Sequence, residues 1–559
     1  MPLSPLAHGR DQGSARRCQT RMDPTPTNAD NPSPVARPRG PARPDVTGHL
    51  LRASSPSHWF QLACLLCAVP VFVARFPPMV DLPQHAAQIA ALREMLSGHW
   101  AFQSLFDLRW LTPYWFGYLA VFVLSPLVGI VLATKLVVAV AVCALPAAAA
   151  RLRQASGGDP HWDWLFLPLP FGFAYEWGFL NFIVAAPLGL LFLARVVRCG
   201  PAMTRRDAVA LALWANALFF LHVLVLVFFG TVAGLMLLAR AGTRRARLVR
   251  VLPLVSVLPV VLVWLVYAIL HPQDAQRKMP LVSFEMWGLG WRRLAEFLPA
   301  LISQSPSAPA FALPAVVALL LPWALGARLS AWSRRLPFAF YLLWMLLGPD
   351  YLLRNSFTYN RFNMVGLPLY LLAIETAPGL GLGALRRRLC PVLVAVLPLG
   401  LLLLQVVRTV AFQRDEVRGF DEILAKMAPG KRALTFAELP YSRYFDAPVF
   451  AHFPSWYQAT KAGLVDYSFS NFAVVPVRYK PGVHPFTGRS FSKAPREVRR
   501  KLLLDKEYDY FVVRAPDDRK RSLFGEDACL VELAASANQW WLYRRVDDVS
   551  ACPRSPRVD

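Results

Sequence analysis

The chain has 559 residues, of which 55% are hydrophobic and only 17% are charged, whereas soluble domains average about 25% charged residues. Lysine and arginine number 60 against 35 aspartate and glutamate residues, which gives a formal net charge of +25. Apolar stretches of membrane-spanning length recur between residues 59 and 410, with arginine clusters between them. This composition excludes a soluble enzyme and indicates a polytopic membrane protein.

The positive charge does not indicate a nucleic-acid-binding protein. Residues 411–559 hold 24 basic and 19 acidic residues, and most of the excess lies in short arginine clusters between the apolar stretches. This is the positive-inside pattern of membrane proteins and not a basic groove with interleaved aromatic residues. We therefore expect the lipid bilayer, and no nucleic acid, as a partner.

The N-terminal region, residues 1–57, is rich in Pro, Arg, Ser and Thr, which predicts a disordered basic tail. A transmembrane region over 58–410 follows. Its first outer loop, 76–126, contains the short apolar stretch 114–125, which ends at Pro126 and which we interpret as an interfacial helix. About eleven spans are expected, at 59–75, 127–150, 161–175, 178–197, 208–222, 223–239, 251–270, 310–327, 337–348, 363–378 and 390–410.

The charge of the loops predicts the orientation. The tail and the loops after spans two, four, six, eight and ten contain 25 basic residues, against about eight in the opposite loops before residue 411. Basic loop residues collect on the cytoplasmic side. We therefore expect a multi-pass protein of a bacterial inner membrane, with its N-terminus in the cytoplasm and its C-terminus in the periplasm.

Residues 411–546 are polar and predict a small α/β domain on the periplasmic side, with 547–559 as a loose tail. A strand at Trp540–Arg544 places Trp540 and Trp541 on opposite faces, so one should be buried and the other more exposed. Cys529 and Cys552 could form a disulfide if the domain lies in an oxidising compartment. The expected elements are a helix at Phe420–Met427 and strands at Ala433–Ala437, Tyr510–Arg514, Leu530–Leu533 and Trp540–Arg544.

Ionisable and polar groups at membrane depth are functional candidates, and here they gather on the outer side. Arginine or lysine would hold an anionic phosphate, and a carboxylate would take a proton from a hydroxyl or hold a metal. The pattern therefore suits a phosphate-bearing lipid substrate. The candidates are Asp81, His85, Lys135, Glu176, Asn181, His222, Asp350, Arg354, Tyr359 and Arg361.

Structural roles remain open for several candidates. An alternative role for Asp81 is the N-cap of the helix that contains His85, and an alternative role for His85 is a structural polar contact. Lys135 could extend to the interface as a snorkelling side chain. Glu176 could be an ordinary loop residue, and Arg361 could anchor the membrane edge.

Four short segments resemble motifs of the GT-C superfamily of integral-membrane glycosyltransferases, both in residue type and in their order along the chain. They are VDLPQH, TKLVV, YEWGFLN and NRFNMVGLPLY. The resemblance implies a polyprenyl-phosphate-linked sugar donor. It also implies that Asp81 is the general base or a metal ligand, with His85 and Glu176 in support. The single Asp of DLPQH departs from the acidic pair of the family, which argues against dependence on a metal and leaves a non-catalytic relative as an alternative. If a divalent cation binds, Asp81 is its expected ligand. The implied substrate-binding residues are Lys135, Asn181, His222, Asp350, Arg354, Tyr359 and Arg361.

The function expected from this resemblance is transfer of a sugar to an envelope lipid, glycan or protein on the periplasmic face. Two alternatives are a transporter or flippase of a lipid-linked substrate and a non-enzymatic subunit of an envelope polysaccharide assembly system. Convergence of Asp81, Glu176 and Arg361 around one outer cavity would favour the transferase.

Overall fold

The computed structural model describes most of the chain between residues 56 and 546. The expected tail 547–559 lies outside the described part, as does the expected tail 1–57 except for its last two residues. Residues Leu50–Asp559 belong to one compact unit. The described ranges are 56–200, 203–271, 282–284, 291–302, 312–353, 355–375, 384–472, 475–483 and 508–546.

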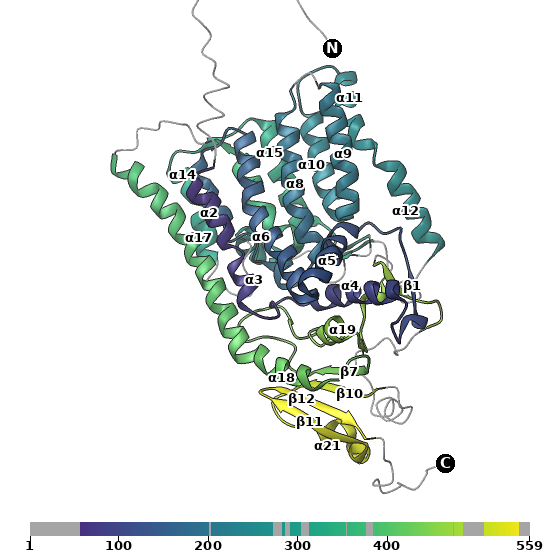
Figure 1. Cartoon of the computed structure of the whole chain (residues 1–559). Coiled ribbons are helices and arrows are strands. Elements are labelled where there is room, and N and C mark those ends of the chain that lie inside the picture. The colour runs from purple at the N-terminus through teal and green to yellow at the C-terminus, as the bar shows by residue number, and fades with distance from the viewer. Residues whose placement is uncertain are drawn as a thin grey trace, which may run out of the picture. The chain divides into compact units, whose positions relative to one another are not determined.

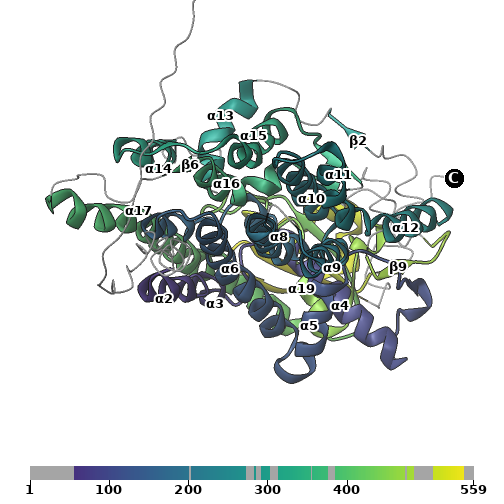
Figure 2. The same ribbon diagram turned by 90° about the horizontal axis from the view of Figure 1, so that it is seen from above.

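A helical bundle forms the larger part of the molecule (Figure 1). Its central helix is α8, which lies between α6, α9 and α10 when the bundle is seen along its length (Figure 2). Gly189 allows the close approach of α10, because a Cβ there would lie 2.3 Å from the Phe229 ring. The bundle helices are α2 (His58–Leu66), α3 (Val69–Val73), α6 (Ile130–Ala155), α8 (Leu180–Arg198), α9 (Arg205–Leu221), α10 (Val223–Leu238), α11 (Arg244–Val255), α12 (Leu258–Leu270), α13 (Trp291–Leu301), α14 (Ala312–Ala324), α15 (Trp332–Leu347), α16 (Gly366–Leu372) and α17 (Ala384–Phe412).

Within the described residues, three helical stretches are long and apolar enough to cross a membrane: Ile130–Ala155, Leu180–Arg198 and Val394–Lys426. The pair α11 and α12, bent by 46°, adds a fourth if it forms one span. The chain is therefore a multi-pass membrane protein. The expected number of eleven spans is not confirmed, because most of the other bundle helices are shorter than a full crossing.

The third expected span, 161–175, is not an α-helix, and this prediction was wrong. The chain forms a 3-10 helix, η2 (Pro160–Phe166), and a short helix, α7 (Phe173–Glu176), with turns between them. Pro168 and Pro170 lack the N–H groups that a continuous helix needs. Nearly all of the segment is buried against the other helices, and irregular backbone is tolerated at membrane depth where protein covers it.

The tenth expected span, 363–378, is also shorter than predicted. A 3-10 helix, η5 (Asn360–Val365), leads into α16, which ends at Leu372. The next residues form strand β6 (Ile374–Glu375), which pairs with β3 (Arg328–Leu329). Backbone pairing with β3 therefore replaces the last turns of the expected helix, and residues 376–378 lie outside the described part.

Helix α5 (Trp115–Val128) passes through Pro126 and does not end there as predicted. Proline cannot donate to the carbonyl four residues earlier, which belongs to Phe122. The Ser125 hydroxyl donates to this carbonyl instead, at 3.0 Å. The helix ends where Gly129, with φ of +79°, redirects the chain into α6.

The C-terminal part contains a five-stranded sheet in the order β11-β12-β10-β7-β8. The four expected strands and the expected helix are present, which confirms these predictions. Trp540 is 1% exposed and Trp541 is half-buried, as alternation predicts. Cys529 is disulfide-bonded, while its expected partner Cys552 lies outside the described residues. The elements are η6 (Gln413–Val417), α18 (Arg418–Lys426), β7 (Arg432–Ala437), α19 (Ser455–Lys461), β8 (Leu464–Val465), η7 (Phe469–Asn471), β9 (Val477–Tyr479), β10 (Tyr510–Arg514), α21 (Lys520–Phe524), η9 (Gly525–Leu530), β11 (Val531–Ala537) and β12 (Trp540–Arg545).

The C-terminal part packs closely on the loop 76–126. Helix α19 lies against α4 (Leu82–Ser97), and strand β9 pairs with β1 (Phe106–Leu108) of that loop. Figure 1 shows α4 and α19 between the bundle and the sheet. Segments from the first and last quarters of the chain therefore meet at one end of the bundle. The remaining described elements are η1 (Gln103–Leu105), β2 (Val282–Ser283), β4 (Tyr351–Leu352) and β5 (Asn355–Ser356).

Candidate active site

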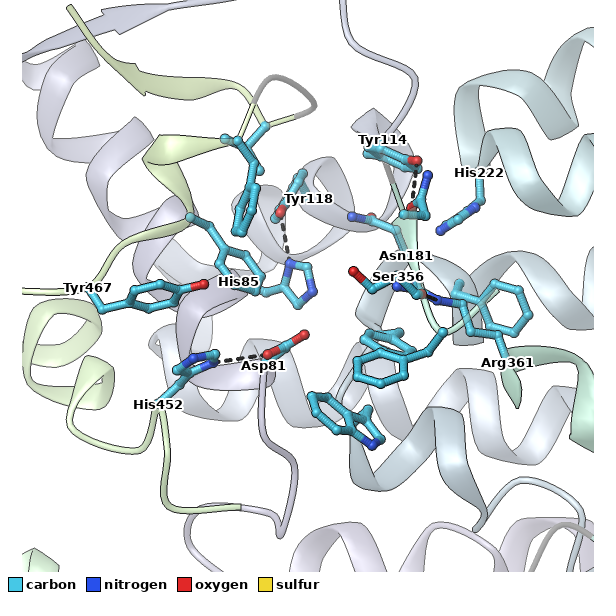
Figure 3. A pocket seen from close by; sticks show the side chains of 18 residues that line it. Asp81, His85, Tyr114, Tyr118, Asn181, His222, Ser356, Arg361, His452 and Tyr467 are labelled. Atoms are coloured by element: carbon cyan, nitrogen blue, oxygen red, sulfur yellow. Dashed lines mark hydrogen bonds and ion pairs between the residues drawn. The ribbon is translucent and has the colours of Figure 1, made fainter. Parts of the chain in front are cut away.

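A hollow of about 240 Å³ lies where α4, α5, the start of α8 and the C-terminal part meet (Figure 3). Its described lining contains one carboxylate, Asp81, and one guanidinium, Arg361. The rest of the polar lining consists of histidine, asparagine, serine and tyrosine side chains. The predicted residues His85, Asn181 and His222 line the hollow together with Asp81 and Arg361.

Asp81 occupies the N-cap position of α4, but its side chain makes no capping hydrogen bond. Its Oδ1 instead lies 3.0 Å from Nδ1 of His452, which is 371 residues later in the chain. This contact favours a functional role over the capping role.

The backbone of Asp81 is fixed by the turn that follows α7. The N–H groups of Val80 and Asp81 donate to the carbonyls of Glu176 and Trp177, at 2.9 and 3.0 Å. Gly178 completes the turn with φ of +73°, and a Cβ on it would lie 2.7 Å from the backbone nitrogen of Leu82. Only glycine fits this contact without displacing the start of α4.

Arg361 is buried on the other side of the hollow. Its Nε donates to the Ser356 carbonyl at 2.9 Å, and its Cζ lies 3.5 Å from the centroid of the Phe179 ring. The two terminal amino groups have no hydrogen-bond partner among the described residues. Burial lowers the pKa of Arg361 to about 10, so the guanidinium stays charged at neutral pH. The arrangement provides a fixed cation that can take an anionic oxygen.

His85 contacts a tyrosine at the wall of the hollow. Its Nδ1 lies 2.8 Å from the Tyr118 hydroxyl, and the Phe469 ring packs edge-on against it. Burial lowers the pKa of His85 to about 4, so the imidazole is neutral at physiological pH. His85 is therefore a neutral polar group beside Asp81.

Two further predicted residues offer neutral hydrogen-bonding groups. Nδ1 of His222 accepts from the Leu224 N–H at 3.2 Å, which leaves Nε2 as the protonated nitrogen. Oδ1 of Asn181 is buried with no hydrogen-bond partner among the described residues. This oxygen faces Gly117 of α5, where a Cβ would lie 2.2 Å from it, so the amide nitrogen is the group that Asn181 can offer to a ligand.

Four predicted residues lie outside the described lining. Glu176 approaches Arg408 of α17 at 3.7 Å and accepts the Ala447 N–H at 3.3 Å, and burial raises its pKa to about 7. These contacts attach the turn before α8 to the C-terminal part. Lys135 donates to the carbonyls of Phe72 and Ala74, at 3.2 and 2.6 Å.

The other two, Asp350 and Tyr359, both contact Arg293 of α13. Asp350 is paired with Arg293 at 2.9 Å, and the guanidinium of Arg293 lies 4.0 Å from the centroid of the Tyr359 ring. Both members of the pair are buried. Arg354, which was also predicted, lies outside the described residues.

Sequence reasoning missed the residues that the C-terminal part contributes: His452, Tyr467 and Phe469. The His452 and Tyr467 rings stack with centroids 4.6 Å apart. Gln84 of α4 holds this wall in place, because it donates to the Ser455 hydroxyl and the Tyr467 carbonyl, at 2.7 and 2.8 Å. No local pattern in the sequence indicated these contacts.

Other missed residues come from the bundle side: Tyr114, Tyr118, Asn355 and Ser356. The Tyr114 hydroxyl donates to Oδ1 of Asn355 at 3.1 Å. The aromatic content of the first outer loop was the available signal for the tyrosines. Across the described ranges, no group of three or more His, Cys, Asp or Glu residues is arranged to hold a metal ion.

No family model matches the chain, and no curated protein matches it. Among solved structures, ArnT from Cupriavidus metallidurans, solved with bound undecaprenyl phosphate, is similar at 14% identity and a TM-score of 0.52, over 88% of this chain and 98% of ArnT. The arabinofuranosyltransferase AftD from Mycobacteria is similar at 16% identity and a TM-score of 0.42, over 89% of this chain. The chain spans 40% of AftD. At these identities the similarity to ArnT shows the fold.

Proposed function

We propose that this chain, whose fold is that of the GT-C superfamily, is a membrane glycosyltransferase that uses a polyprenyl-phosphate-linked sugar. The acceptor would be an envelope lipid, glycan or protein on the periplasmic face. The observation that carries the proposal is the placement of Asp81 and Arg361 on one hollow whose other polar lining consists of histidine, asparagine, serine and tyrosine side chains. Such a lining suits a hydroxyl-rich sugar with one anionic group. The undecaprenyl phosphate in the ArnT structure supports this donor class.

In the proposed reaction an acceptor hydroxyl oxygen forms a bond to the anomeric carbon of the donor sugar. The bond from that carbon to the donor phosphate oxygen breaks, and polyprenyl phosphate leaves with the electron pair. Asp81 takes the proton of the acceptor hydroxyl as general base. Arg361 binds the phosphate and stabilises the charge that grows on it as the bond breaks.

The other residues have supporting roles in this proposal. His452 holds one oxygen of Asp81 and thereby directs the other toward the acceptor. His85, Asn181 and His222 bind sugar hydroxyls. Glu176 acts as a positioning residue, because it attaches the turn that fixes the Asp81 backbone. We assign no substrate contact to Lys135, Asp350 or Tyr359.

The two alternatives from the sequence receive less support. Asp81 and Arg361 line one hollow, and Glu176 lies in the turn that holds Asp81. Only two of the three residues expected to converge line the hollow, because Glu176 lies outside its described lining. The pairing of Asp81 with Arg361 supports a transferase over a scaffold. A flippase needs a path through the bundle, and the described hollow lies at one end of it.

The proposal is tested with a deletion strain complemented by the wild-type chain or by Asp81→Asn. Asparagine keeps the size of aspartate but has no basicity, so transfer should fall by roughly a hundredfold or more. Lipidomics and glycan profiling should show the unmodified acceptor accumulating in the deletion and Asp81→Asn strains. Asp107→Asn, in the same loop but outside the hollow, is the control and should restore the product. Full product formation by Asp81→Asn at normal protein level would refute the mechanism.

A further inference from the structure

A second and larger hollow lies between α2 and α6, away from the candidate active site. It measures about 570 Å³ and is lined mainly by apolar and small side chains. Ala139, Cys143, Ala144 and Ala147 form the wall on α6. Because these side chains are short, they leave the space between the two helices unfilled.

The polar groups of this hollow collect at one end. Arg151 and Gln61 lie there, whereas Phe72 and Leu136 close the other end with apolar side chains. Arg151 is exposed and uses one Nη1 bond, to Oε1 of Gln154 at 3.1 Å. Its remaining donors have no hydrogen-bond partner among the described residues. The neighbouring Arg153, by contrast, is buried in an ion pair with Asp163 at 2.7 Å.

The dimensions indicate what can occupy the hollow. From Leu136 to Arg151 the wall on α6 is about 22 Å long at 1.5 Å per residue. The hollow is therefore elongated along α6, and it is open beside the exposed side chains of Leu65 and Val140. A hydrocarbon chain suits an elongated apolar space that has a cationic group at one end.

We propose that the hollow between α2 and α6 binds an anionic phospholipid, with an acyl chain between the helices and the phosphate at Arg151. The apolar interior matches the chain, and the free guanidinium at the mouth matches the phosphate. Arg151 belongs to a cluster that the loop charges place in the cytoplasm, so the lipid comes from the cytoplasmic leaflet. The site is independent of the proposed transferase activity.

The test uses the purified full chain in detergent, with dioleoyl phosphatidylglycerol as probe and dioleoyl phosphatidylcholine for comparison. Native mass spectrometry measures how much of each lipid stays bound. Arg151→Gln should lower the affinity for phosphatidylglycerol by about tenfold, as expected for loss of a charge-assisted hydrogen bond. Ala144→Phe fills the hollow and should abolish retention of both lipids.

Two control variants distinguish binding in this hollow from general effects of a lost positive charge or an added bulky side chain. Arg198→Gln removes an exposed arginine of α8, and Ala210→Phe adds the same bulk on α9; both should bind lipid as the wild type does. A phosphatidylglycerol with a photoactivatable acyl chain should crosslink to residues 64–68 and 139–147.

Equal effects of Arg151→Gln and Arg198→Gln would overturn the proposal, as would crosslinks elsewhere. It would also be overturned if Ala144→Phe changed the oligomeric mass but not lipid retention, since that result would assign the surface to a second transmembrane helix. None of these outcomes depends on sugar transfer, so the proposed function is tested separately.

Discussion

His452 and Asp81 form the most informative contact at the scale of single residues. A hydrogen bond from His452 to a carboxylate of the hollow fixes which oxygen of Asp81 remains available to a substrate. Hydrogen bonds to charged groups contribute about 1.5–3 kcal/mol. The contact therefore has a measurable kinetic consequence if Asp81 is the base.

We expect His452→Leu to lower kcat by about tenfold or more while the KM for the donor changes little. His452→Asn should recover part of the loss, because its amide N–H can replace the Nδ1–H donor. Steady-state transfer assays with wild type and both variants measure this split. His99→Gln serves as control, because His99 is an exposed histidine of the loop 76–126 that also contains Asp81. Equal losses in His452→Leu and His452→Asn would indicate a purely steric role.

Glu176 predicts a pH dependence of stability. Burial raises its pKa from 4.5 to about 7 in the folded chain. Between these values the folded state keeps a proton that the unfolded state has lost, so its contribution to stability, complete below pH 4.5, falls as pH rises to about 7. Thermal unfolding in detergent should show Tm decreasing over this range. Glu176→Gln cannot ionise, so its Tm should change less with pH over this range. An identical pH profile of Tm for this variant and the wild type would contradict the assignment.

At the scale of elements, the turn between α7 and α8 determines where α4 begins. It supplies the two carbonyls that bind the backbone of Val80 and Asp81, and Gly178 lets the two segments approach. A side chain at this position meets backbone atoms, which cannot move aside independently. Position 178 therefore couples the irregular segment 161–175 to the candidate base.

Gly178→Ala should reduce transfer at least tenfold by displacing the backbone of Asp81, although residue 178 is not itself part of the described lining of the hollow. Gly157→Ala is a matched control, because Gly157 has φ of +72° but nothing within 4 Å of its Cβ position. Both variants carry the same left-handed strain, of about 1–2 kcal/mol. Only Gly178→Ala adds the clash. Equal transfer rates for the two variants, at equal protein levels, would show that the close approach does not position Asp81.

At the scale of the whole molecule, the helix that begins in α17 runs through η6 into α18 and so joins the bundle to the C-terminal part. Arg408, on this helix, approaches Glu176 and donates to the Tyr444 carbonyl at 2.7 Å. The C-terminal part is thereby held on the bundle at several points. It contributes a wall of the hollow, so the proposed site is complete only with both parts.

The arginine clusters predict the orientation of the entire chain. A reporter fused after Leu389 should report the cytoplasm, and a reporter fused after Asp559 should report the periplasm. Paired alkaline phosphatase and fluorescent-protein fusions at both positions measure this. A cytoplasmic C-terminus would place the hollow on the wrong side for a periplasmic acceptor and would contradict the proposed function.

The sequence by itself determined the features that depend on local composition. Hydropathy and charge indicated a membrane bundle, and local patterns located four strands of the C-terminal sheet. Side-chain chemistry gave ten candidate site residues, among them Asp81 and Arg361. These properties depend on residues that are neighbours in the sequence, so they can be predicted without knowledge of the fold.

Tertiary structure decided which distant residues meet. His452 reaches Asp81 because α19 packs on α4, and Glu176 faces Arg408 because α17 passes the turn before α8. The irregular backbone of segment 161–175 is tolerated because other helices bury it. Such outcomes depend on packing between elements far apart in the chain, and hydropathy or local spacing contains no information about that packing.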